Sequence, residues 1–124
     1  STFLLKMEFV AFIGKDKENW GQVTALIKRL ECDKIVLVKD KEAEEFPATD
    51  QCKIIEIDMT KDLIQLKEEL KEKLKKELAG DFEATLSIAS GNGKAHMAII
   101  AALLNIPVGI RIVAFTKSGI EYLT

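Results

Sequence analysis

The sequence predicts an α/β fold: a single domain with a Rossmann-like, open and mostly parallel sheet of about five or six strands and helices on both faces. Two observations predict this fold. Apolar segments of strand length alternate with longer segments that repeat apolar residues at helical spacing, so long crossovers join neighbouring strands. With 124 residues, 48% of them hydrophobic, and no internal repeat, the chain is sized for one core.

The first half of the chain is expected to hold three strands and two helices. Residues 1–6 resemble a leader or tag, and Gly14 ends the first strand. Asn19 is expected to cap the first helix, and Asp40 to cap a short helix that Pro47 terminates. In chain order, the predicted elements are a strand at 7–13, a helix over 19–30, a strand at 34–39, a short helix at 41–46 and a strand at 53–57.

The second half begins with the longest predicted helix. We expect it to start at Asp58 or Thr60 and to end at Gly80, with one apolar face formed by four leucines: Leu63, Leu66, Leu70 and Leu74. A strand at 82–89, a helix at 93–105 and a strand at 108–116 complete the alternation. Residues 119–124 are expected to be a tail, a short extra strand or the start of a linker.

Composition and charge argue against several classes of function. The 18 basic and 20 acidic residues give a net charge of -2, which disfavours binding of duplex DNA by this domain itself. Cys32 and Cys52 have neither the spacing nor the histidine partners of a zinc site, and no metal or other cofactor is expected. No signal peptide or membrane-spanning segment is evident, so the sequence predicts a cytoplasmic protein that does not bind membranes.

The loop Ser90-Gly91-Asn92-Gly93-Lys94 is the strongest candidate site. It follows a predicted strand and opens a predicted helix, where backbone N–H groups and the positive end of the helix dipole converge. Gly91 and Gly93 permit a close approach of a ligand, Ser90 and Asn92 supply short polar side chains, and Lys94 adds a positive charge. We therefore predict a phosphate-binding loop, against the alternative that it is only a turn.

Known nucleotide motifs do not account for this loop. A Walker P-loop requires a glycine where Ile88 stands and a hydroxyl residue where Ala95 stands. A dinucleotide fingerprint also fails, because Gly14 at the end of the first strand lacks the second and third glycines. With His96 as the one histidine, no catalytic triad can be assigned.

Residues around the loop extend the candidate site. His96 lies in the first turn of the following helix, and Lys15 follows the first strand at the same predicted edge of the sheet. Four other residues are weaker candidates: Asp16, Asp58, Lys61 and Lys117. The helix over 95–104 is apolar almost all round, so it is expected either to be buried internally or to contact a second copy in a homodimer.

The first strand ending at Gly14, the late loop Ser90–Lys94 and the Ala- and Met-containing helix behind it resemble the CARF domain, the CRISPR-associated Rossmann-like sensor. The resemblance covers residues 7–116, with Asn92 in place of the family's second consecutive glycine. It implies a homodimer that binds a cyclic oligoadenylate in antiviral defence. The resemblance implies that Ser90, Gly91, Asn92, Gly93 and Lys94 would contact the ligand and that Gly14 and Lys15 would form the opposite wall. From its position in the first turn behind the loop, His96 is a further candidate for contact with the ligand.

Three functions remain open. The domain could be the sensor of a longer transcriptional regulator or effector nuclease. It could be a stand-alone, metal-independent ring nuclease, in which a ribose 2'-hydroxyl attacks the neighbouring phosphate, Lys94 stabilises the developing charge and either Ser90 or His96 assists. It could also be an interaction domain with no nucleotide ligand.

Overall fold

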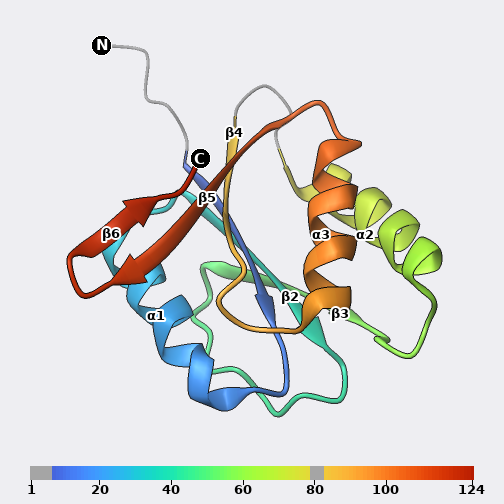
Figure 1. Ribbon diagram of the computed structural model, residues 1–124, viewed down its shortest axis with the longest axis horizontal. Helices are drawn as coiled ribbons and strands as arrows, with labels where there is room; N and C mark the ends of the chain where they lie inside the picture. Colours follow the sequence, from blue (N-terminus) through green and yellow to red (C-terminus); the bar gives the residue numbers. More distant parts are fainter. Residues whose placement is uncertain (1–6, 79–82) are drawn as a thin grey trace.

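The computed structural model describes residues 7–78 and 83–124, and it confirms the predicted α/β class. A six-stranded sheet has the order β3-β2-β1-β4-β5-β6 (Figure 1). Strands β1 to β5 pair in parallel, and β6 pairs antiparallel with β5. The strands are β1 (Glu8–Ile13), β2 (Lys34–Asp40), β3 (Cys52–Ile57), β4 (Glu83–Ser87), β5 (Gly109–Thr116) and β6 (Gly119–Tyr122). The helices are α1 (Trp20–Arg29), α2 (Leu63–Glu77) and α3 (Gly93–Leu104), with a short 3-10 helix at Lys17–Asn19.

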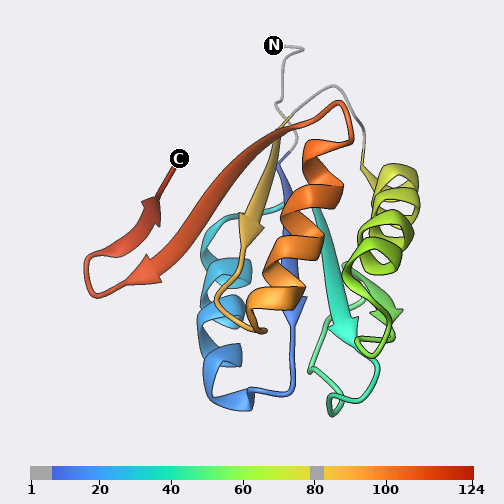
Figure 2. The same ribbon diagram turned by 45° about the vertical axis from the view of Figure 1, so that its right-hand side comes forward.

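Helices cover both faces of the sheet, as the sequence predicts. Figure 2 shows α1 on one face and α2 with α3 on the other. Side chains of a strand alternate between the faces, so Phe9 and Ala11 of β1 pack on the α1 side, whereas Val10 and Phe12 pack beneath α2 and α3. Two apolar layers therefore hold β1 in the centre of the fold.

The strand order reverses between β1 and β4. From β1 the chain proceeds outward through β2 and β3, and after α2 it returns to pair β4 with the other side of β1. In Figure 2 the parallel strands point toward the lower edge of the sheet, where the loops after β1, β2 and β4 meet. In open α/β sheets this carboxyl edge, at the point of reversal, is where ligands bind.

The predicted short helix at residues 41–46 is wrong. The chain makes a turn after β2 and then runs without regular structure to β3. Six residues before a proline cannot offset the cost of nucleating a helix, and the segment is instead held by two apolar side chains that enter the core. Ala43 and Phe46 are buried, and the Phe46 ring packs edge-on against Trp20 with centroids 5.3 Å apart.

Helix α2 starts later than the sequence predicts. Its N-cap is Asp62, whose carboxylate accepts the Gln65 amide in a capping box, instead of Asp58 or Thr60. The Asp58 carboxylate accepts the amide and hydroxyl of Thr60 and so forms a turn of its own. The helix ends at Glu77, and the predicted terminator Gly80 lies outside the described residues. The expected apolar face is present, with Leu66, Leu70 and Leu74 fully buried and Leu63 packed beside them.

The last residues form a strand. Residues Gly119–Tyr122 pair antiparallel with β5, with Thr116 opposite Gly119 and Val113 opposite Tyr122. Gly119 has φ +102, the left-handed conformation that the tight turn after β5 requires. Of the alternatives for this segment, the structure shows the short extra strand.

Candidate functional site

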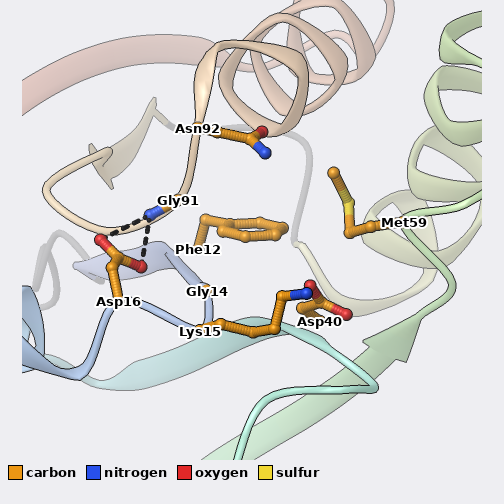
Figure 3. A pocket seen from close by; sticks show the side chains of 8 residues that line it. All are labelled: Phe12, Gly14, Lys15, Asp16, Asp40, Met59, Gly91 and Asn92. Atoms are coloured by element: carbon orange, nitrogen blue, oxygen red, sulfur yellow. Dashed lines mark hydrogen bonds between the residues drawn. The ribbon is translucent and has the colours of Figure 1, made fainter.

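A cavity of about 190 Å³ opens at the carboxyl edge of the sheet, where the strand order reverses. It lies among the ends of β1 and β2 and the loops after β3 and β4 (Figure 3). The lining residues are Phe12, Gly14, Lys15, Asp16, Asp40, Met59, Gly91 and Asn92. The fold therefore brings together two segments that the sequence singles out, the end of the first strand and the glycine-containing loop.

A hydrogen-bonded clamp joins these two segments. The Asp16 carboxylate accepts hydrogen bonds from the Ser90 hydroxyl at 2.7 Å and from the Gly91 amide at 3.0 Å (Figure 3 draws the contacts with Gly91). The Ser90 hydroxyl oxygen in turn accepts the Gly14 amide at 2.9 Å. Ser90 is completely buried, so its hydroxyl fastens one loop to the other and does not face the cavity.

The clamp depends on an ionised Asp16. Partial burial disfavours the charged carboxylate, but hydrogen bonds from Asn19, Ser90 and Gly91 outweigh burial and hold the pKa of Asp16 below its ordinary value. Asn19 precedes α1 as expected, yet its side chain does not cap that helix. It donates to Asp16 instead, at 2.8 Å. A protein carboxylate thus occupies the Gly91 amide that the sequence assigns to a ligand phosphate.

Two glycines allow the loops to touch. A Cβ on Gly14 would lie 2.7 Å from the Asp16 carboxylate and 3.0 Å from the Gly91 Cα. Gly91 has φ +105, and a Cβ there would lie 2.6 Å from the Phe12 ring. The Gly14 carbonyl accepts the Trp20 indole N–H at 3.0 Å, so helix α1 also fixes this corner. Neither glycine can be replaced without displacing its neighbour.

The first turn of α3 keeps part of the predicted capacity to bind anions. The Asn92 side chain accepts the Ala95 amide at 2.9 Å as the N-cap. The amides of Gly93 and Lys94 precede the first intrahelical bond, which His96 makes to the Asn92 carbonyl. These two N–H groups lie at the positive end of the helix dipole.

Lys94 and His96 are engaged with backbone carbonyls. The Lys94 ammonium donates to the Met59 carbonyl at 2.9 Å and so braces the loop after β3, and Lys94 does not line the cavity. The His96 Nε2 lies 2.8 Å from the Ser90 carbonyl. Because a carbonyl only accepts, Nε2 carries the proton. Both side chains support the walls of the site in this structure.

The cavity carries more negative charge than the sequence analysis anticipates. Lys15 contributes one ammonium group, which lies 3.6 Å from Glu42, but Asp16 and Asp40 contribute carboxylates. Asp40 is 6% exposed, and its Oδ1 accepts the Glu42 amide at 3.0 Å. Sequence reasoning assigns Asp40 only to helix capping. Its position as the last residue of the second strand is the signal that points to the carboxyl edge.

A second, apolar depression adjoins the loop. It is a groove of about 620 Å³ between α2 and α3, and we call it the α2–α3 groove. Its lining residues are Leu63, Ile64, Lys67, Gly93, His96, Met97, Ile100, Ala101 and Leu104. Three of these large apolar side chains are strongly exposed: Ile64 by 63%, Met97 by 55% and Leu104 by 71%. The sequence predicts that α3 is apolar on more than one face. In the structure one apolar face packs on the sheet, and another lines the α2–α3 groove and is open to solvent.

No protein-family model matches the chain, and a search of curated proteins finds no significant match. Among the helices of residues 7–78 and 83–124, none has both the length and the apolar character needed to cross a membrane. Within the same described ranges, His, Cys, Asp and Glu side chains form no group of three or more that could hold a metal ion.

Proposed function

We propose that this chain is a CARF-type sensor that binds a cyclic oligoadenylate as a homodimer in the reducing cytoplasm. The observation that carries the proposal is the cavity at the reversal between β1 and β4, built from the two segments on which the resemblance rests. Two free cysteines fit the compartment.

Phosphate would be held at the rim of the cavity. The first-turn amides of Gly93 and Lys94 offer hydrogen bonds and a favourable dipole, and the exposed ammonium of Lys15 adds charge from the opposite wall. Gly14 and Gly91 keep the backbone close enough for contact, and Asn92 offers a polar side chain. Ser90, the Lys94 ammonium and His96 act as positioning groups that hold these walls.

A second copy would cover the α2–α3 groove. The groove is lined mostly by apolar side chains and includes Gly93 and His96 of the loop helix, so a partner seated there lies directly beside the ligand rim. A two-fold axis through this surface would place two rims side by side and would double the positive groups facing a ring of phosphates.

The dimer is tested by sedimentation equilibrium. Met97→Glu places a charge in the groove and is expected to convert dimer to monomer. Leu123→Glu is the matched control, because Leu123 is 64% exposed and lies outside the groove. A parent protein that is monomeric at all concentrations, or a dimer unaffected by Met97→Glu, would reject this part of the proposal.

Ligand binding is tested by calorimetry and thermal shift with cyclic tetra-adenylate, cyclic hexa-adenylate, linear tetra-adenylate and NAD. A cyclic ligand is expected to raise the melting temperature, since it binds the folded state alone. Lys15→Ala should weaken binding about fivefold, the value of one partly solvated charge contact. Lys17→Ala is the matched control, because Lys17 pairs with Glu44 and does not line the cavity.

The α2–α3 groove also supports a second candidate, an interaction domain with no nucleotide ligand. The same panel separates the two functions. Binding of a cyclic oligoadenylate supports the sensor, whereas no response to any nucleotide, together with a dimer that Met97→Glu disrupts, supports the interaction domain.

A further inference from the structure

We infer that Asp40 recognises a ribose 2'-hydroxyl and makes the cavity selective for ribonucleotide over deoxyribonucleotide ligands. The inference rests on the proposed nucleotide-binding function and names a specificity-determining residue for it. Asp40 lies outside the loop segments on which the resemblance depends.

Asp40 is placed to contact a ligand deep in the cavity. It is the last residue of β2, and because Lys39 pairs with Ile13 in the parallel register, Asp40 is level with Gly14 at the end of β1. One oxygen, Oδ1, accepts the Glu42 amide, which fixes the carboxylate. Within the described residues the other oxygen, Oδ2, makes no hydrogen bond. Because no buried side-chain oxygen of the described residues lacks a partner, Oδ2 is open to solvent at the cavity, where the donor of a ligand can replace water.

The second carboxylate of the cavity does not meet this description. Both oxygens of Asp16 already accept hydrogen bonds from Gly91, and Ser90 and Asn19 add further ones. Figure 3 shows the Asp16 side chain turned toward Gly91, whereas Asp40 lies on the wall beside Lys15. Asp16 therefore serves the clamp, and Asp40 is available to a ligand.

The chemistry of Asp40 selects the part of a nucleotide that it contacts. An ionised carboxylate only accepts hydrogen bonds and repels phosphate, so its partner is a hydroxyl or an amine. The cavity of about 190 Å³ is smaller than the roughly 300–1,000 Å³ of sites that hold a whole ligand, so it admits one portion of a nucleotide.

The cavity extends from Asn92, beside the first turn of α3, across Gly14 at the end of β1 to Asp40 at the end of β2, so a phosphate at that turn and a sugar at Asp40 would occupy its two sides. In dinucleotide sites an acid beyond the first strand likewise bonds a ribose hydroxyl. There the phosphate-binding turn follows the first strand, whereas here it follows β4 with β1 in between, so only the pairing of an acid with a ribose hydroxyl carries over. In a ring of 3'–5' linkages the 2'-hydroxyl is the one that remains free, and it distinguishes ribose from deoxyribose.

The experiment compares paired ligands by calorimetry. The probes are cyclic tetra-adenylate and its all-2'-deoxy counterpart, together with AMP and 2'-deoxy-AMP at millimolar concentration. The parent protein is expected to bind each ribose form about tenfold more tightly than its deoxy partner, the value of one hydrogen bond to a charged acceptor.

Asp40→Asn keeps the oxygen that accepts the Glu42 amide and removes the charge. It should weaken the ribose forms and leave the deoxy forms unchanged or tighter, because a repulsion with phosphate is also removed. If Asp40 only stabilised the fold, Asp40→Asn would lower the affinity for the ribose and the deoxy ligands to the same extent. Asp58→Asn is the matched control: Asp58 directly follows β3 at the same edge, engages Thr60 and does not line the cavity.

Failure of the inference and failure of the proposed function are distinguishable. Equal binding of ribose and deoxy forms by the parent, or equal loss of both in Asp40→Asn, overturns the role of Asp40 while the sensor function stands. Ribose-selective binding of AMP without binding of any cyclic oligoadenylate supports Asp40 and rejects the cyclic ligand. No binding of any ribose probe overturns both.

Discussion

Replacing Ser90 by alanine should loosen the corner that forms the cavity. The Ser90 hydroxyl is completely buried and makes two hydrogen bonds, accepting from the Gly14 amide at 2.9 Å and donating to Asp16 at 2.7 Å. Alanine leaves the buried Gly14 amide without its acceptor, which costs about 1–3 kcal/mol. Asp16 loses only one of its several hydrogen-bond donors, so this loss costs less than the loss at Gly14. We expect the free energy of unfolding to fall by about 3 kcal/mol in total.

The measurement is urea unfolding followed by the fluorescence of Trp20, whose indole bonds the Gly14 carbonyl, with calorimetry for the melting temperature. A loss of about 3 kcal/mol corresponds to roughly 10 °C for a domain of this size. Ser87→Ala is the matched control. Ser87 is equally buried, but its hydroxyl oxygen accepts only a local hydrogen bond of 3.3 Å from Ala89. If Ser90→Ala costs no more than Ser87→Ala, the clamp does not stabilise this corner.

Three further predictions concern the same fold. Gly91→Ala should destabilise the protein by about 2–3 kcal/mol in urea unfolding, because φ +105 and contact with Phe12 exclude a Cβ; a neutral effect would contradict the geometry. Asp16→Asn should lower stability most above about pH 5. The folded pKa of Asp16 is lowered, so its contribution is present above the unfolded pKa near 3.9 and is lost as pH falls through the folded pKa; a pH-independent difference would refute this. Burial, with the charge of Asp33 and the neighbouring Cys52, raises the pKa of Cys32 to about 11, so iodoacetamide at pH 8 should modify Cys32 only after denaturation, as mass spectrometry can show.

Local sequence signals predict most of the fold. β-Branched and aromatic segments bounded by glycine or polar residues give the five parallel strands within a few residues of their observed ends, and the leucine face of α2 packs as expected. These signals succeed because alternation and helical periodicity reflect burial directly. They fail at residues 41–46, where long-range packing of Phe46 on Trp20 prevails over a weak local preference for helix.

For the candidate site, too, local sequence determines some features and the tertiary structure determines others. The sequence alone determined that a loop containing Gly91 and Gly93 opens α3 and that Gly14 ends β1, since strand ends and helix starts carry local chemical signals. Only the tertiary structure decided what the donors of that loop bind. Asp16, 74 residues before Ser90, accepts the Ser90 hydroxyl and the Gly91 amide, and the Lys94 ammonium reaches the Met59 carbonyl. Among residues 7–78 and 83–124, none donates a hydrogen bond to Oδ2 of Asp40. Hydrogen bonds between distant segments depend on which strands lie side by side in the sheet, and that order is fixed by packing across the whole fold and not by the residues of one loop.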